Sequence, residues 1–236
     1  MAENHKVVSS DEWIAARKQL LIKEKEFTRL RDQLSQQRRD LPWEAVNKEY
    51  VFEGPNGKQT LPELFDGRSQ LLVYHFMFDP SWEAGCPHCS FWADNFNGIG
   101  VHLNHRDVTM IAVSRAPYGK LAAYEKRMGW NFKWVSSHDT DFNFDYHVSF
   151  TPEELARKEA FHNFTTQSPP GPETVGISVF YKGESGKVFH TYSTYSRGVD
   201  MVNCAYHYLD LVPKGRDEAG QRNPQFWVRR HDEYGR

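Results

Sequence analysis

Two cysteines separated by two residues are the groups in this chain best suited to redox chemistry. Cys86 and Cys89 frame the motif Cys-Pro-His-Cys. Residues three apart on a helix lie about one turn apart, so the two thiols could form a disulfide once that turn relaxes slightly. The thiolate is the nucleophile in exchange reactions, and a helix N-terminus favours negative charge. We therefore predict that Cys86, at a helix start, attacks a disulfide and that Cys89 resolves the resulting mixed disulfide.

The two residues inside the motif are expected to support this chemistry. Pro87 suits the first turn of a helix, where its missing N–H leaves no hydrogen bond unmade. His88 is expected to stabilise the Cys86 thiolate through an imidazolium charge or its N–H, which would lower the thiol pKa. We count Pro87 and His88 with the two cysteines as catalytic residues. The alternative is a pair of buried cysteines that have this spacing by chance.

The segments around the motif predict an alternation of strands and helices that would hold it in place. We expect a central strand at 71–76, a motif helix to about 97–98, a second strand at 107–113, a helix at 118–128, a hairpin of strands at 175–181 and 187–192, and a last helix at about 199–211. This order implies a parallel pair of strands with a right-handed crossover.

The chain before the central strand begins with a helical arm, residues 1–45. Ser9 followed by Glu12 is a capping box, which marks the start of a helix. An apolar stripe then follows at Trp13, Leu20, Phe27 and Leu34. We expect this stripe to pack against the same chain, with a homodimer formed through the helix as the alternative.

The remainder divides into a domain, an insertion and a tail. The domain is expected to span 46–214, and the least regular stretch, about 137–172, is expected to be an insertion lying over the core. Residues 215–236 read as a polar C-terminal tail.

Three segments carry a more specific resemblance. They are Gly-Cys-Pro-His-Cys-Ser-Phe-Trp-Ala-Asp-Asn (85–95), His-Thr-Tyr-Ser-Thr-Tyr-Ser-Arg-Gly (190–198) and Leu-Asp-Leu-Val-Pro-Lys-Gly-Arg (209–216). Together with the element order, they resemble a thioredoxin-like family catalogued as domain of unknown function 899. The resemblance implies an α/β, thioredoxin-like fold with an N-terminal helical arm and an insertion before the C-terminal β-hairpin. It brings no established substrate. The pair Pro87-His88 is similar to that of DsbA-type disulfide oxidants, and the Cys-Pro-x-Cys frame is also that of glutaredoxins.

The chain departs from related patterns at positions that bear on the substrate. Gly85 stands directly before Cys86, where thioredoxins usually have Trp, and Trp82 lies three residues earlier. The cis-proline that thioredoxins place before the hairpin has no clean match, because Pro172 comes too early beside Thr174 and Val175.

Five residues are candidates for substrate binding: Trp82, Arg115, Thr174, Val175 and Tyr192. Arg115 follows the second strand, so it should emerge at the same end of the sheet as the motif, where it could bind an anionic substrate. A surface arginine that caps a turn is the competing interpretation. His190, Tyr192 and Tyr195 could line the site from an alternating strand, or could face solvent or the insertion. His75, inside an apolar strand, is expected to be a core histidine.

Composition and the remaining cysteine limit the other possibilities. The formal net charge of −2 and the lack of a basic arm argue against nucleic-acid binding. The longest apolar run is far shorter than the roughly 20 residues of a membrane span, and the N-terminus lacks the apolar core of a secretory signal. With only three cysteines, the protein is expected to be cytoplasmic. A zinc site combining the motif with Cys204 and His207 is a less favoured alternative, so we expect no metal and no organic cofactor.

The sequence therefore predicts a thiol–disulfide oxidoreductase whose partners are protein or small-molecule thiols and disulfides. One alternative is a thiol peroxidase that uses Cys86, although Glu83 stands where peroxiredoxins have a threonine. Another is a thioredoxin-like interaction protein with a regulatory dithiol.

Overall fold

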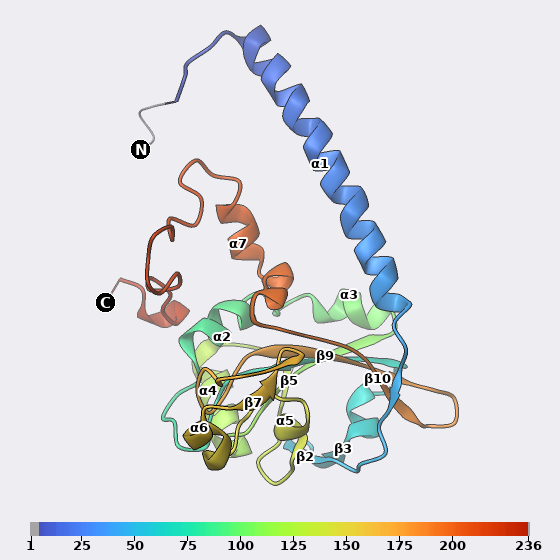
Figure 1. Cartoon of the computed structure of the whole chain (residues 1–236). Helices are drawn as coiled ribbons and strands as arrows, with labels where there is room; N and C mark the ends of the chain where they lie inside the picture. Colours follow the sequence, from blue (N-terminus) through green and yellow to red (C-terminus); the bar gives the residue numbers. More distant parts are fainter. Residues whose placement is uncertain (1–4, 236) are drawn as a thin grey trace.

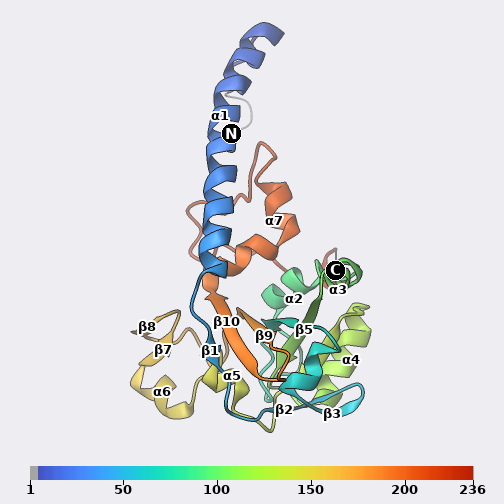
Figure 2. The same cartoon turned by 90° about the vertical axis from the view of Figure 1, so that its right-hand side faces the viewer.

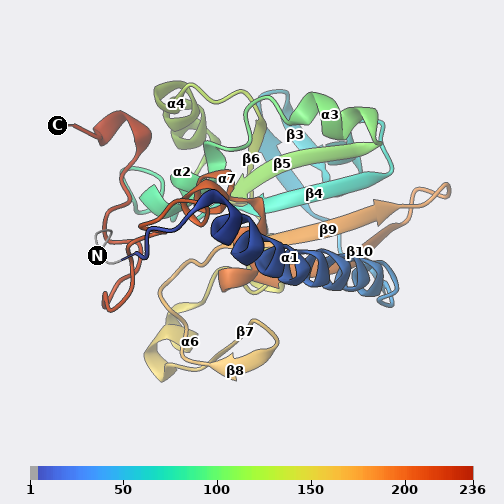
Figure 3. The same ribbon diagram turned by 90° about the horizontal axis from the view of Figure 1, so that it is seen from above.

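The strand that leads into the Cys-Pro-His-Cys motif lies in the middle of an eight-stranded sheet. The computed structural model describes residues 5–235 and orders the strands of this sheet β1-β10-β9-β4-β5-β6-β2-β3. Strand β4 pairs in parallel with β5 and antiparallel with β9, and β5 pairs in parallel with β6. Figure 3 shows β6, β5, β4, β9 and β10 following one another, in that order, across the sheet.

The elements have the following bounds. The strands of the main sheet are β1 Glu44–Ala45, β2 Val51–Gly54, β3 Gly57–Thr60, β4 Gln70–His75, β5 Val108–Ser114, β6 Lys133–Ser136, β9 Gly176–Lys182 and β10 Val188–Tyr195. A separate two-stranded sheet consists of β7 Ala160–His162 and β8 Thr165–Gln167. The α-helices are α1 Ser10–Arg39, α2 Pro87–Ala93, α3 Gly100–His105, α4 Tyr118–Met128, α5 Phe142–Asp145, α6 Pro152–Arg157 and α7 Cys204–Leu209. Short 3₁₀ helices are η2 Leu61–Phe65, η3 Ser196–Val202 and η4 His231–Glu233.

Each face of the sheet carries its own apolar core, because alternate residues of a strand point to opposite faces. Tyr74 and Phe76 belong to the core that includes residues of α2, α4 and α7. Leu71 and Val73 belong to the core on the other face, which includes residues of η2 and α5. The motif strand is therefore covered on both sides, and α2 lies on the first of these faces.

This arrangement is a thioredoxin-like α/β fold, as the element order predicted. The motif strand β4 lies between a parallel neighbour and an antiparallel hairpin, and the motif helix follows β4 directly. The segment between β6 and β9, which holds α5, α6, β7 and β8, stands where the insertion was expected, and Figures 2 and 3 show α6, β7 and β8 beyond the β10 side of the sheet. The helix predicted at 118–128 has these bounds, and its end at Gly129 follows from a left-handed backbone there (φ 63°).

The N-terminal helix forms as its capping box predicts, but it does not pack as expected. The Ser9 side chain accepts a hydrogen bond from the Glu12 N–H, and α1 then runs for 30 residues. No residue of α1 is buried, and Figures 1 and 2 show the helix projecting away from the sheet. The expectation that its apolar stripe packs against the same chain is therefore wrong. Periodicity shows that one face is apolar, but not what covers it.

Two further helix predictions need correction. The motif helix ends at Ala93 rather than near residue 97, and a separate helix, α3, follows. The single last helix expected at 199–211 is divided at Asn203, whose side chain caps α7 by accepting a hydrogen bond from the Tyr206 N–H. Cys204 is therefore the first residue of α7 and is exposed.

His75 is a core residue, as expected, with 1 % of its surface exposed. Its Nε2 atom lies 2.8 Å from the Ser178 hydroxyl oxygen. Burial lowers the pKa of His75 to about 3, so the imidazole is neutral at physiological pH. It lies on the sheet face opposite the motif helix, in contact with the rings of Phe142 and Tyr146.

In the part of the chain that the structure describes, every helix is too short or too polar to cross a lipid bilayer.

Candidate redox site

The loop before Cys86 is fixed by close packing around Gly85. A Cβ atom at Gly85 would lie 2.7 Å from a ring carbon of Phe76 and 2.9 Å from one of Tyr124. No side chain fits there, which explains why glycine replaces the tryptophan that thioredoxins place at this point. The backbone N–H of Cys86 donates to the Met77 carbonyl at 3.1 Å, which ties the motif to the end of the strand region.

Cys86 has the environment of a nucleophilic thiol. It is the N-cap residue of α2, and Pro87 occupies the first helical position, as predicted. A hydrogen bond from the Cys89 side chain, followed by contacts with His88 and the Cys89 backbone N–H, holds the pKa of Cys86 well below its ordinary value, although burial opposes this. The Cys86 Sγ to His88 Nδ1 distance is 4.0 Å, which is at the outer limit for a hydrogen bond to sulfur. His88 favours the Cys86 thiolate first through this contact and then through its charge, and the same contact with Cys86 raises the pKa of His88.

Cys89 has the opposite character. It is 2 % exposed, and burial together with the negative charge of Cys86 raises its pKa well above the ordinary thiol value. Its sulfur accepts a hydrogen bond from the Met77 N–H at 3.4 Å. The buried Tyr74 hydroxyl lies close enough to Cys89 for each group to affect the other's ionisation. Cys89 is thus a neutral thiol that donates to Cys86, and both cysteines are reduced in this structure.

The C-terminal residues form one side of the site. We call residues 223–233 the C-terminal strap. The Gln225 carbonyl lies 3.3 Å from His88 Nε2, and the Trp227 ring packs edge-on against Phe91 with centroids 5.3 Å apart. Val228 is 2 % exposed. A stretch that reads as polar in the sequence is therefore in direct contact with the motif helix.

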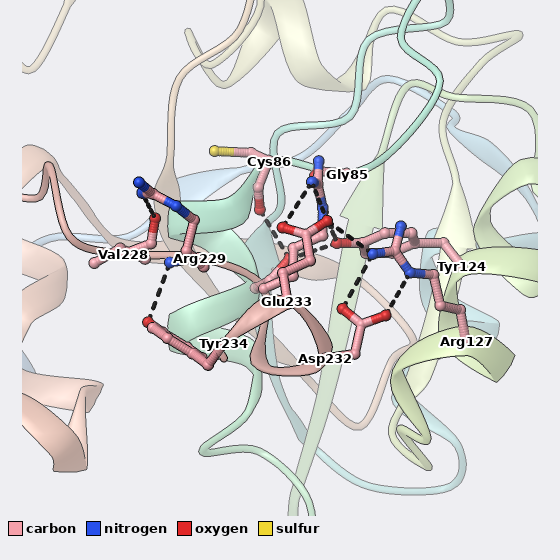
Figure 4. A network of polar contacts seen from close by, with 11 residues as sticks. Gly85, Cys86, Tyr124, Arg127, Val228, Arg229, Asp232, Glu233 and Tyr234 are labelled. Atoms are coloured by element: carbon pink, nitrogen blue, oxygen red, sulfur yellow. Dashed lines mark hydrogen bonds and ion pairs between the residues drawn. The ribbon is translucent and has the colours of Figure 1, made fainter. Parts of the chain in front are cut away.

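Arg230 makes the strongest link between the strap and the motif loop. Its Nη2 donates to the Gly85 carbonyl at 2.8 Å, and its Nε donates to the Tyr124 hydroxyl at 2.8 Å. Glu233 pairs with Arg230 and also with Arg127 of α4. Figure 4 shows this network on one side of the motif loop, with the Cys86 side chain pointing away from it. The strap therefore braces the backbone behind the thiol and does not bond to the sulfur.

Beside the two thiols is a cavity of about 380 Å³. Cys86, His88 and Cys89 lie on its wall with Tyr74, Met77, Trp92 and Val175. The remaining lining comes from η3, from Tyr206, from Arg216 and Glu218, and from residues 223–225. Its size lies within the range of small-molecule sites. The motif thus opens into a recess rather than onto a flat surface.

The substrate-binding candidates from the sequence are only partly brought together. Val175 lines the cavity beside the thiols, whereas Trp82, Arg115, Thr174 and Tyr192 do not. The Lys120 ammonium donates to the Trp82 carbonyl, and the Thr174 N–H donates to the Val148 carbonyl.

The two remaining candidates are held elsewhere. Arg115 reaches the motif end of the sheet, as predicted, but it pairs with buried Glu173 at 3.0 Å and with Asp79 at 3.7 Å. Tyr192 lies under the Arg38 guanidinium near the end of α1. His190 and Tyr195 contact the ring of Tyr146 and its backbone carbonyl, respectively, rather than the motif.

Sequence reasoning missed Gln225 and Arg230 as site residues. The signal available was Phe-Trp-Val-Arg-Arg at 226–230, an aromatic and apolar cluster in an otherwise polar tail. Between residues 5 and 235, no group of three or more His, Cys, Asp or Glu side chains is arranged to hold a metal ion.

Comparisons with known proteins give the family and similar folds. No curated protein matches the chain. Peroxidoxin BcpB from Mycobacterium tuberculosis is 13% identical with a TM-score of 0.46, over 69% of this chain and 93% of that chain. A cysteine-to-serine mutant of PrxQ from Xylella fastidiosa is 13% identical with a TM-score of 0.45, over 70% of this chain and 94% of that chain. A yeast mitochondrial 1-Cys peroxiredoxin is 12% identical with a TM-score of 0.43, over 72% and 78% of the two chains.

The family profile described as "bacterial protein of unknown function (DUF899)" matches residues 2–234. That match spans the arm, the redox motif and the strap. The protein therefore belongs to the DUF899 family.

Proposed function

We propose that this protein is a thiol–disulfide oxidoreductase that works through Cys86 and Cys89. The observation that carries the proposal is the different placement of two thiols one helical turn apart. Cys86 caps the N-terminus of α2 and Cys89 lies inside the helix, 2 % exposed, and in keeping with this the pKa of Cys86 is lowered and that of Cys89 is raised. A thiolate is the attacking form, whereas a neutral, buried second thiol is protected until it is needed.

The reaction follows from these charges. The Cys86 thiolate attacks one sulfur of a substrate disulfide, forms a mixed disulfide and releases the other sulfur as a thiolate. The negative charge on Cys86 is one of the causes that raise the pKa of Cys89. Formation of the mixed disulfide removes this charge, so Cys89 then loses its proton more easily. Cys89 then loses its proton to the departing thiolate and attacks Cys86. The second substrate sulfur leaves as a thiolate and takes a proton from solvent, so the products are the Cys86–Cys89 disulfide and two substrate thiols. The reverse sequence oxidises a substrate dithiol.

The chemistry needs no metal or organic cofactor. Its partners are protein or small-molecule thiols and disulfides, with no part for nucleic acid or membrane. We place the protein in the cytoplasm, where a dithiol of this kind is kept reduced between turnovers.

Single cysteine variants test the assignment. Cys86→Ser is expected to abolish disulfide exchange, and Cys89→Ser is expected to trap mixed disulfides that mass spectrometry detects. The matched control is Cys204→Ala, which changes the exposed third cysteine and should leave turnover unchanged. If Cys86→Ser traps substrates and Cys89→Ser is inert, the two roles are reversed.

The same proteins separate this function from its alternatives. An interaction protein with a regulatory dithiol would show no turnover with any disulfide. A thiol peroxidase would consume hydrogen peroxide much faster than it reduces disulfides. Either result would refute the proposed activity.

A further inference from the structure

The shape of the cavity limits what can reach the reactive sulfur. Cys86 is only 8 % exposed and lies on the cavity wall with His88. The strap lines one part of the cavity through Asn223, Pro224 and Gln225, and η3 lines another. A disulfide held in a folded protein has bulky chain on both sides of its sulfurs, whereas a free disulfide of low molecular weight can enter such a recess. Access therefore favours a small substrate.

The cavity also contains a carboxylate with unused acceptor capacity. Glu218 accepts hydrogen bonds from the Tyr206 hydroxyl at 2.9 Å and from Trp227 Nε1 at 2.7 Å, both on Oε1. Among residues 5–235, no hydrogen bond is made by its Oε2. A carboxylate fixed in this way is suited to accept from an ammonium group.

The cavity lining also includes a cation. Arg197 Nε and Nη2 both donate to Asp200, but the Arg197 side chain is 85% exposed and its Nη1 makes no hydrogen bond among residues 5–235. Arg216, by contrast, is paired with both Asp200 and Asp210. Arg197 is therefore the group with donors left for a substrate carboxylate.

The deep end of the cavity has an unpartnered polar atom beside the thiols. The Tyr74 hydroxyl is fully buried, lines the cavity and has no hydrogen-bond partner of ordinary geometry among the described residues. A buried hydroxyl left without a partner is unfavourable, so a ligand atom that bonds to it gains affinity. The position of Tyr74 beside Cys89 places that ligand atom near the reacting sulfurs.

We propose that the cavity binds a low-molecular-weight disulfide whose halves carry both an ammonium and a carboxylate group, as in cystine. The proposal rests on the oxidoreductase function above. Glu218 binds the ammonium group, Arg197 binds the carboxylate, and Tyr74 hydrogen-bonds near the sulfurs. One cystine is reduced to two cysteines, and the Cys86–Cys89 pair is oxidised to a disulfide.

The first test compares two small disulfides with the reduced protein. Cystine carries both charges, whereas bis(2-hydroxyethyl) disulfide is neutral and of similar reach. We expect Glu218→Gln to lower the ratio of kcat/KM for cystine to kcat/KM for the neutral disulfide roughly tenfold, the size of one charge-assisted hydrogen bond. Glu218→Gln retains an oxygen that accepts from Tyr206 and Trp227. Arg197→Gln should lower the same ratio, whereas Asp217→Asn, which changes an exposed neighbour outside the cavity, should not.

The second test needs no turnover. Lanthionine is a thioether analogue of cystine that cannot be reduced. It should slow the alkylation of Cys86 by iodoacetamide and leave the alkylation of exposed Cys204 unchanged. Glu218→Gln should weaken this protection.

The outcomes separate the binding site from the activity. Protection by lanthionine without any disulfide reduction would refute the proposed function but support the site. Reduction of disulfides with no protection, and with the same substrate ratio in Glu218→Gln as in the unchanged protein, would overturn the site and leave the function standing. Reduction of insulin as fast as cystine would also overturn the proposal, because protein disulfides would then reach Cys86 freely.

Discussion

The arm α1 and the C-terminal strap lie at opposite ends of the chain and differ in how they are held. Helix α1 has eight large apolar side chains that are 39% to 64% exposed, and none of its residues is buried. The strap is short and mostly polar, yet Val228 is buried, Trp227 packs on the motif helix and Arg230 bonds to the loop before Cys86. From their sequences, the apolar arm would be expected to pack on the domain and the polar strap to extend into solvent.

The difference shows that apolar content and attachment are separate properties. A regular apolar stripe can remain without a partner in its own chain when no facing surface is in reach. A few specific contacts can attach a polar segment if each buried polar group is paired. For this protein, the segment that shapes the site is the one with the weaker sequence pattern.

Removal of the strap should give the largest effect on stability, and it should distinguish the strap from the arm. A chain that ends at residue 222 loses the burial of Val228 and Trp227 and the Arg230 hydrogen bonds, which should lower the free energy of unfolding by about 2 kcal/mol after the gain in chain entropy. Urea unfolding measures this loss. Removal of residues 1–40 is the control and should change the unfolding of the monomeric domain far less. Equal losses from the two truncations would show that the arm is also held by the domain.

Arg230→Ala sharpens the comparison to one side chain. It removes the donors to the Gly85 carbonyl and the Tyr124 hydroxyl, and we expect a loss of about 1 kcal/mol in unfolding free energy because those partners stay buried. Arg229→Ala is the matched control, since Arg229 is exposed and its side chain bonds only to strap carbonyls. Similar losses for the two variants would mean that the charge of the strap matters more than its contact with the motif loop.

The strap also reaches the thiol chemistry through His88, which gives a pH-dependent prediction. The pKa of Cys86 is depressed, so its alkylation rate should stay high below the usual thiol range and should fall only as pH drops through the folded-state value. His88→Gly removes a group that favours the thiolate, so the pKa of Cys86 should rise. A rise of one unit corresponds to about 1.4 kcal/mol and makes the disulfide about 30 mV less oxidising.

Thiolate absorbance against pH and equilibration with glutathione measure these two effects. The chain that ends at residue 222 loses the Gln225 contact to His88 and should show part of the same shift, whereas removal of the arm should show none. A Cys86 pKa that is the same in all of these proteins would contradict a role for His88.

Substitutions in the arm should have the smallest effect on the stability of the domain. We propose that the arm forms a homodimer. A stripe of this size can supply the roughly 800 Å² per partner of a standard interface, and a second copy of the same helix offers a matching stripe. Leu20→Glu combined with Phe27→Glu should halve the mass seen by analytical ultracentrifugation and change the unfolding of the domain by less than about 0.5 kcal/mol. Lys18→Glu, on the opposite face of α1, is the control. A mass that is unchanged by the double substitution, or already monomeric without it, would rule out this dimer.

Local patterns were sufficient to predict much of the scaffold. The capping box at Ser9 set the start of α1, Gly129 set the end of α4, and the apolar run before the motif identified β4 within one residue of its observed bounds. The spacing of Cys86 and Cys89 identified the candidate redox pair. These features depend on residues within a few positions of each other, so they can be read directly from the chain.

The tertiary structure decided how the site is closed and which side chains line it. Arg230 and Gly85 are 145 residues apart, and no short-range pattern relates them. Glycine is required at position 85 because the rings of Phe76, after β4, and Tyr124, in α4, converge on it. Of the five predicted substrate-binding residues, Val175 alone lines the cavity. Arg115 and Tyr192 were plausible from their strands but found other partners, because a strand fixes the direction of a side chain and leaves its neighbours to the packing of distant segments.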